Sequence, residues 1–273
     1  MKSARKFSNL YCPIQPSFEK ALNTFREFNA ESPAIFNGGI KFSEYNVGNM
    51  NRFWVIPDGC LHLVICCHKE HPSANICGSL FKSREGIFAR SDCDYFVVCF
   101  LPGYAEFFFK YPIDMFSESE VPVQDVLPHA EELLRSIAEQ ASLEDRVRAF
   151  ERYYLNHFNE ALQINPLINY LTEKIISCHG TLNVNELSRE TGYSTRYILK
   201  AFEKHVGLPP KLFSRIIRFQ HVIQLLENNQ YGQMLDHIYE LGYFDQNHFI
   251  KDFKNFSLLT PKKYVQHIAD RSY

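Results

Sequence analysis

The spacing of apolar residues predicts a β-rich segment followed by a helical one. Between residues 53 and 100, apolar positions alternate with polar ones or form short runs separated by turn formers, which is typical of antiparallel strands. From about residue 128 onward, apolar residues recur at intervals of three and four, which predicts helices. The pattern therefore favours an α+β chain: a small N-terminal β-barrel with helices, then an all-α C-terminal part.

The clearest strand follows the turn formed by Pro57, Asp58 and Gly59, residue types that favour tight turns. After this turn one set of side chains alternates with another along the chain, which places them on opposite faces of a strand. The first set is Cys60, His62, Val64, Cys66 and His68, and the second is Leu61, Leu63, Ile65 and Cys67. Further strands are expected at 79–81, 86–89 and 95–100, and a helix at 17–28.

Two helices are expected at 129–140 and 143–158, either as a dimer seam or as a cover for the barrel. Asn165 precedes Pro166, and a residue before proline disfavours continued helix. We therefore place a domain border near 160–165 and divide the chain into residues 1–160 and 166–273.

A stretch near the C-terminus has the marks of a helix with one polar face. Gly242 closes one segment and Asp245 caps the next, since Gly adopts the left-handed conformation cheaply and Asp accepts from free N–H groups. Apolar residues at helical spacing should face a core; they are Phe249, Phe253 and Phe256. The opposite face suits a DNA major groove and carries Gln246, Asn247, Ile250, Lys251 and Lys254. Thr260 and Pro261 start a further helix.

A similar unit precedes it in the chain. Gly192 ends a helix and Ser194 caps the following one, whose inward residues are Ile198, Ala201 and Phe202. The outward face holds Arg196, Leu199, Lys200 and Glu203. A long helix at 211–227 then carries Arg215 and Arg218, after a Pro209–Pro210 pair that provides no side-chain cap.

The second unit resembles the second helix-turn-helix of the AraC/XylS family of transcription regulators, and the first unit resembles that family's first motif. The matching residues of the second unit are Leu241, Gly242, Asp245, Gln246, His248, Phe249, Phe253, Lys254, Pro261 and Tyr264. The resemblance covers about 166–264. Residues 53–158 are similar to a cupin-like N-terminal domain of uncharacterised function that precedes this module in some AraC-type regulators, through the 57–60 turn and through Phe100 with Pro102 and Gly103.

The resemblance implies a one-component regulator: a sensor or oligomerisation domain joined to a module with two recognition helices. If these present on one face about 34 Å apart, they enter successive major-groove segments of a site of roughly 20 base pairs. The expected DNA-binding residues are Ser194, Thr195, Arg196, Leu199, Lys200, Arg215, Arg218, Gln246, Asn247, Ile250, Lys251 and Lys254. Arg196 suits guanine, Gln246 and Asn247 suit adenine, and the two aliphatic residues suit thymine methyl groups.

Charge distribution agrees with this reading. Residues 166–273 carry 13 Lys and Arg against 10 Asp and Glu, a net charge of +3, whereas residues 1–165 carry −5. A basic part joined to an acidic part fits a DNA-binding module attached to something else. The sequence shows neither a bilayer-spanning apolar run nor a secretory signal. We therefore expect a cytoplasmic protein with no membrane partner.

The eight cysteines are expected to be cytosolic thiols rather than a disulfide framework. Cys60, His62, Cys66 and His68 share a strand face, which favours buried thiols with rim histidines but leaves open a redox- or metal-sensing regulator. Phosphate-loop, zincin, nucleophile-elbow and zinc-finger spacings are absent, so we expect no enzyme, no catalytic residue and no cofactor. The alternative is a cupin-like metal-dependent enzyme carrying a DNA-binding tail. Expected partners are double-stranded DNA, a small-molecule effector, a second copy of the chain and, for an activator, RNA polymerase.

Overall fold

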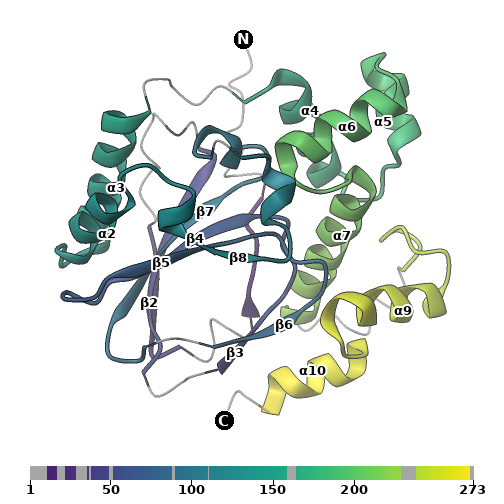
Figure 1. The fold of residues 1–273 in the computed structure, drawn as a ribbon. Helices are drawn as coiled ribbons and strands as arrows, with labels where there is room; N and C mark the ends of the chain where they lie inside the picture. The colour runs from purple at the N-terminus through teal and green to yellow at the C-terminus, as the bar shows by residue number, and fades with distance from the viewer. Residues whose placement is uncertain are drawn as a thin grey trace.

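The structure, a computed structural model, describes residues 11–16, 22–28, 36, 38–48, 52–87, 90–109, 111–158, 164–228 and 238–270. It consists of a β-rich part flanked by a helix pair, beside a part built of helices (Figure 1). The expected order, an antiparallel β-region followed by a helical region, is confirmed. The cupin-like character of the first part stays a prediction.

Within the described residues, eight strands form two antiparallel sheets. They are β1 (Thr24–Glu27), β2 (Ile40–Asn46), β3 (Arg52–Val55), β4 (Leu61–Cys66), β5 (Ser73–Cys77), β6 (Arg84–Ile87), β7 (Asp94–Phe100) and β8 (Glu120–Pro122). Six of them follow the order β1-β2-β7-β4-β5-β8, while β3 pairs with β6 in a separate sheet. The expected strands at 86–89 and 95–100 correspond to β6 and β7.

The large sheet has two chemically different faces because side chains alternate along each strand. On β4, Leu61, Leu63 and Ile65 join the main hydrophobic core, as the sequence pattern predicts. The opposite face of β4 carries His62, Val64 and Cys66, which line an internal cavity. One face of the sheet thus stabilises the fold, and the other encloses space.

Helices cover the core face of this sheet. Three short 3₁₀ helices, η3 (Ala105–Phe107), η4 (Ile113–Phe116) and η5 (Val123–Asp125), lead into α2 (Ala130–Ala138) and α3 (Leu143–His157). Phe150 of α3 packs 5.7 Å from Phe42 and 5.8 Å from Phe108, measured between ring centroids. Phe42 in turn stacks on Phe96 at 5.9 Å. The two helices therefore cover the sheet, one of the two roles expected for them.

A buried ion pair joins α3 to the sheet. Arg146 of α3 contacts Glu44 of β2, and their side chains are only 5% and 4% exposed. Glu44 also accepts a hydrogen bond from Arg26 at a distance of 2.5 Å. The Arg26 side chain is 62% exposed. Arg146 also donates to the Gln140 carbonyl at 3.2 Å and forms a longer ion pair with the Asp94 carboxylate at 3.7 Å.

The first helix of the helical part is capped by Asn165, whose side chain accepts from the Leu167 N–H; the domain border near 160–165 stays a prediction. The helices of this part are α4 (Pro166–Ser177), α5 (Val184–Thr191), α6 (Thr195–Val206), α7 (Pro210–Glu227), α9 (Gln246–Ser257) and α10 (Pro261–Asp270). As expected, Pro209 gives α7 no side-chain cap. None of the helices in the described ranges combines the length and apolar character needed to cross a bilayer. Buried residues of both parts belong to one continuous core.

Two local predictions were wrong. Within the helix expected at 17–28, residues Thr24–Glu27 form strand β1 on the edge of β2, because backbone pairing with the sheet overrides local spacing; residues 17–21 lie outside the described residues. The strand expected at 79–81 lies earlier, at β5, where Ala74 and Ile76 pair with Ile65 and Leu63. The pairing with β4 buries Ala74 and Ile76. The pattern of residues 79–81 alone does not predict this pairing.

Candidate nucleic-acid interface and internal cavity

The N-terminal part holds a cavity of about 260 Å³ between its two sheets. Its floor is the second face of β2, β7, β4 and β5, and β3 and β6 contribute Phe53, Val55, Arg84 and Gly86. Aromatic and aliphatic side chains dominate one end of the wall, where they form a small second core; they include Phe25, Tyr45, Phe53, Val64, Tyr95 and Val97. An enclosed apolar space with a few polar groups is the usual form of a small-molecule site.

A row of polar and thiol side chains crosses the floor of the cavity from strand to strand. Lys41 of β2 pairs with Cys99 of β7, and Cys99 pairs with His62 of β4. His62 pairs with Cys77 of β5, which pairs with Glu120 of β8. All five line the cavity, and directly opposed residues have Cβ atoms about 4.5–5.5 Å apart. The row therefore places a cation, two thiols, an imidazole and a carboxylate side by side.

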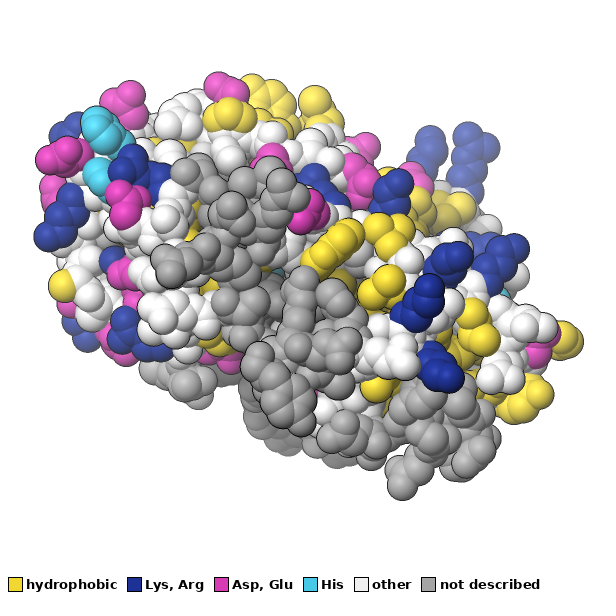
Figure 2. Space-filling model, turned by 90° about the horizontal axis from the view of Figure 1, so that it is seen from below, with side chains coloured by type: hydrophobic (Ala, Val, Ile, Leu, Met, Phe, Trp, Pro, Cys, Tyr) yellow, Lys and Arg dark blue, Asp and Glu magenta, His cyan; other side chains and the backbone are white. Residues whose placement is uncertain are grey.

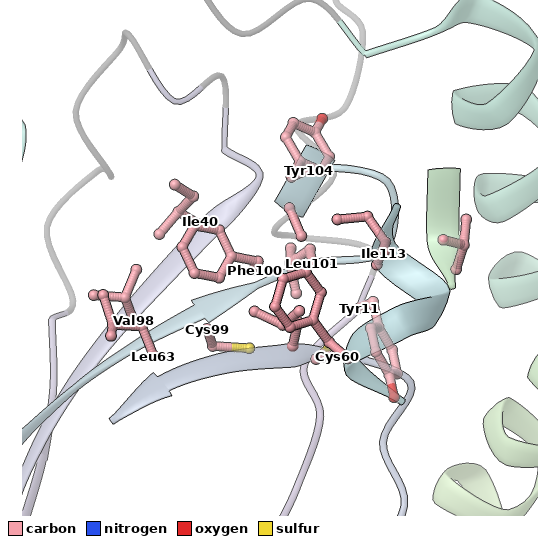
Figure 3. Packing of buried hydrophobic residues seen from close by; sticks show 14 of the residues in the cluster. Tyr11, Ile40, Cys60, Leu63, Val98, Cys99, Phe100, Leu101, Tyr104 and Ile113 are labelled. Atoms are coloured by element: carbon pink, nitrogen blue, oxygen red, sulfur yellow. The ribbon is translucent and has the colours of Figure 1, made fainter. Parts of the chain in front are cut away.

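The turn before β4 adds Asp58 and Cys60 to this row. The Asp58 carboxylate lies 2.9 Å from His62 Nε2 and accepts from the Cys60 backbone N–H at 3.0 Å. Cys60 and Cys99 are buried, at 1% and 8% exposure. Figure 3 shows the Cys99 side chain directed towards the end of β4 where Cys60 lies.

The two thiols of the row, Cys99 and Cys77, have different pKa values because their surroundings differ. A hydrogen bond from Cys60 and the charge of His62 lower the Cys99 pKa to about 6, although burial opposes this. Burial alone would lower the pKa of His62. The charges of Cys99 and Asp58 and their hydrogen bonds have a larger, opposite effect, so the pKa of His62 is raised well above its usual value. Burial, followed by the nearby Glu120, raises the Cys77 pKa to about 11. These shifts favour the thiolate form of Cys99 beside a protonated His62, and the thiol form of Cys77.

The predicted alternation is present for His62, Val64 and Cys66, whereas Cys60 and His68 lie outside β4. The neighbours of His62 in the row come from other strands and from the turn. Cys66 has a separate partner: its sulfur lies 2.7 Å from that of Cys93. Within the part of the chain that the structure describes, no group of three or more His, Cys, Asp or Glu side chains is arranged to hold a metal ion.

In the helical part, α6 presents most of the expected residues of the first unit to solvent. The Ser194 hydroxyl caps the helix by accepting from the Tyr197 N–H at 3.3 Å. Ile198 and Phe202 are fully buried, which turns Arg196, Leu199 and Lys200 outward. Thr195 is half-buried at the first position of the helix.

Helix α9 repeats this arrangement. Asp245 caps it by accepting from the His248 N–H at 2.7 Å, and three phenylalanines, Phe249, Phe253 and Phe256, anchor it in the core. The outward residues Gln246, Asn247, Lys251 and Lys254 are exposed, and Ile250 is half-buried. Figure 2 shows Lys and Arg side chains gathered at the end of the molecule formed by the C-terminal helices, whereas basic and acidic side chains mix at the opposite end.

Arg215 and Arg218 of α7 make contacts within the helical part, and their role in DNA binding stays a prediction. Arg215 donates to Asp252 of α9 at 2.9 and 2.6 Å and lies over the Phe256 ring. Arg218 donates to the carbonyls of Gly180 and Gly242 at 2.8 and 3.0 Å and lies over the Tyr243 ring. Both guanidinium groups therefore join α7 to neighbouring segments, and the structure gives them a positioning role that local spacing does not reveal.

The sequence reasoning missed exposed aromatic side chains beside both helix starts. Tyr193 and Tyr197, at 47% and 50% exposure, stack with ring centroids 5.0 Å apart. Phe244, immediately before the Asp245 cap, is 83% exposed. Tyr193 and Phe244 each directly precede a capping residue, Ser194 and Asp245, and this position is the sequence signal that points to them.

The sequence of the helical part is similar to that of known proteins. Residues 187–267 match the family described as a helix-turn-helix domain. Residues 187–267 form an AraC-type helix-turn-helix domain. The resemblance of the C-terminal part to AraC/XylS regulators is thereby confirmed for these residues.

Two relatives share this domain. An uncharacterized HTH-type transcriptional regulator of Haemophilus influenzae is 29% identical over 109 residues, which are 40% of this chain and 36% of that protein. The F1 operon positive regulatory protein of Yersinia pestis is 27% identical over 103 residues, which are 38% of this chain and 33% of that protein. The matched segment thus spans about a third of the length of each relative.

Solved structures of ToxT from Vibrio cholerae also align with the chain. One, at 1.65 Å resolution, has a TM-score of 0.44 and 11% identity and covers 84% of this chain and 98% of ToxT. Another, with bound unsaturated fatty acid, has a TM-score of 0.38 and 12% identity and covers 82% and 90% of the two chains.

The helix-turn-helix domain packs directly on the β-rich part. The amide of Gln220 on α7 donates to the Pro57 carbonyl at 2.8 Å, and its oxygen accepts from the Ile14 N–H at 3.0 Å. Phe213 of α7 lies so close to Gly59 that a Cβ there would approach its ring to 2.9 Å. The turn that carries Asp58 of the cavity row therefore rests on α7.

Proposed function

We propose that the chain is a sequence-specific DNA-binding transcription regulator whose β-rich part responds to a small molecule. The observation that carries this proposal is the pair of capped helices within the helix-turn-helix domain, α6 and α9, each anchored by buried aromatic residues. Their outward faces hold the cations and amides that read base edges and phosphates.

We assign base readout to the exposed faces of these helices. Arg196 forks onto guanine O6 and N7, while Gln246 and Asn247 pair with adenine. Leu199 and Ile250 contact thymine methyl groups, so the site opposite α9 has A·T character. Ser194, Thr195, Lys200, Lys251 and Lys254 contribute phosphate contacts, and Arg215 and Arg218 hold the helices that make them.

The effector role rests on the cavity and its connection to α7. Asp58 contacts His62 inside the cavity, and its neighbours Pro57 and Gly59 contact Gln220 and Phe213 of the helix-turn-helix domain. A ligand that moves His62 or Asp58 therefore has a short route of packed groups to the DNA-binding helices.

Selection of a DNA site tests the regulator proposal. Purified full-length protein incubated with a randomised DNA pool should enrich one sequence spanning two major-groove segments. Arg196→Ala and Gln246→Ala should each lower affinity for that sequence about 5- to 150-fold, since each base contact is worth ~1–3 kcal/mol. The loss should be confined to sites with the matching base. Enrichment of no sequence, or of a G·C-only segment opposite α9, would count against the assignment.

Lys254→Ala should behave differently, because a phosphate contact carries no sequence information. We expect weaker binding to all sequences and a slope of log affinity against log salt that is smaller by about 1. A titration over a salt series measures this slope. Lys82, an exposed lysine of the β-rich part, provides the control, and Lys82→Ala should leave the slope unchanged.

A further inference from the structure

The floor of the cavity contains a nucleophile–base–carboxylate arrangement that the regulator proposal does not use. Cys99 and His62 are directly opposed on neighbouring strands, and Asp58 contacts His62 Nε2 at 2.9 Å. A thiol beside an imidazole that a carboxylate orients is the arrangement that activates cysteine nucleophiles. All three groups line the same cavity, so an organic molecule bound there meets the sulfur.

We propose that Cys99 captures soft electrophiles, such as α,β-unsaturated ketones, as covalent adducts inside this cavity. The apolar wall formed by Phe25, Phe53, Val64 and Val97 suits the hydrocarbon part of such a molecule. This inference deepens the proposed sensor role, because it names the chemistry of the ligand that the cavity takes.

The reaction needs no further reactant. The Cys99 thiolate attacks the carbon β to the carbonyl and forms the C–S bond, while the C=C electron pair shifts to give an enolate. The enolate takes the proton held by the His62 imidazolium, which is the proton that the Cys99 thiol gave up. The sum is addition of S–H across the double bond, and the protein gains the whole mass of the electrophile.

The groups around Cys99 favour its thiolate, which is the reactive form, more than the groups around Cys77 favour the thiolate of Cys77. The charged and titratable groups that face it are Lys41 from β2, His62 from β4, Asp58 and Cys60 from the turn, and Tyr11 from the N-terminal segment. The pKa of about 6 for Cys99 against about 11 for Cys77 favours the thiolate at Cys99 and the thiol at Cys77 at pH 7. Cys77 lines the same cavity and is partly exposed, whereas Cys99 is buried, so preferential labelling of Cys99 over Cys77 would reflect activation rather than access.

Intact-mass spectrometry and peptide mapping test the inference. Full-length protein free of reductant is treated with trans-3-hexen-2-one, or with hexan-2-one, which lacks the double bond. We expect one adduct of full probe mass on Cys99 from the unsaturated ketone and none from the saturated one. The rate at Cys99 should be half-maximal near pH 6 and flat from pH 7 to 9, with Cys77 unmodified over that range.

Two variants test whether Cys60 and His62 activate the Cys99 thiol or whether Cys99 reacts only because it is accessible. Cys60→Ala and His62→Gln should each move the half-maximal pH upward; a return to the ordinary thiol value of about 8.5 would slow labelling at pH 7 by about 30-fold. Equal labelling of Cys77 and Cys99 in the unmutated protein, or a Cys99 midpoint at pH 8.5 or above, would overturn the proposal. This readout does not involve DNA, so its failure is distinguishable from failure of the regulator proposal.

Discussion

Replacing Arg146 by methionine is expected to lower the free energy of unfolding by about 3–5 kcal/mol. Arg146 and Glu44 are nearly inaccessible, at 5% and 4% side-chain exposure, and removing one member of a buried ion pair leaves the other charge without compensation. Glu44 would keep its ion pair with Arg26, but that side chain is 62% exposed, so solvent screens the pair and it offsets little of the burial cost. Urea unfolding of the full chain, followed by circular dichroism, measures the difference.

An exposed pair on the same helix supplies the control. Arg148 contacts Asp145 at 3.0 Å, and their side chains are 67% and 45% exposed, so Arg148→Ala should cost no more than about 1 kcal/mol. The double variant Glu44→Leu with Arg146→Met should recover much of the loss, because two apolar groups of similar volume leave no charge buried. If Arg146→Met and Arg148→Ala lowered the free energy of unfolding equally, the buried pair would contribute no more to stability than the exposed pair.

Features set by a few neighbouring residues were predictable from the sequence. Ser194 and Asp245 cap helices as expected, because a cap depends on the residue type and on the next three positions. The outward faces of α6 and α9 follow from helical spacing. Local signals therefore account for the helix-turn-helix domain, where the sequence reasoning succeeded best.

Features set by pairing between distant segments were not predictable. Cys99 and His62 are 37 positions apart, and only the strand order β2-β7-β4-β5-β8 places them in one row. Strand β1 exists because β2 offers it an edge. The roles of Arg215 and Arg218 depend on acceptors 24 to 38 residues away. Periodicity shows which face a side chain takes, but it does not show which side chain of another element lies opposite.

Replacing Arg218 is expected to uncouple the two DNA-binding helices. One guanidinium joins the Gly180 carbonyl, just after α4, to the Gly242 carbonyl, just before α9, and it also lies over Tyr243. The approach is close at both ends, since a Cβ on Gly180 would meet the Ser214 carbonyl oxygen at 2.0 Å, and one on Gly242 would lie 3.4 Å from the Arg218 side chain. Each charged hydrogen bond is worth about 1.5–3 kcal/mol, so Arg218→Ala should release the segment that leads into α9.

We therefore expect Arg218→Ala to lose about 10- to 100-fold in affinity for the selected two-segment site, because a mobile second helix gives up the advantage of binding both segments at once. Affinity for a half-site opposite α6 should change little, and fluorescence anisotropy with the two DNA lengths measures both.

Arg218→Lys distinguishes this positioning role from the direct DNA contact that the sequence predicts. A lysine keeps the charge but has a single ammonium group, which does not reproduce the planar fork that spans two carbonyls. If Arg218 positions α9, the lysine variant should resemble the alanine variant, and its salt slope should match that of the unmutated protein. If Arg218 contacts phosphate instead, lysine should retain most of the affinity, and alanine should lower the salt slope by about 1. Lys211→Ala, which removes an exposed charge from the same helix, shows how much of any loss is general electrostatics.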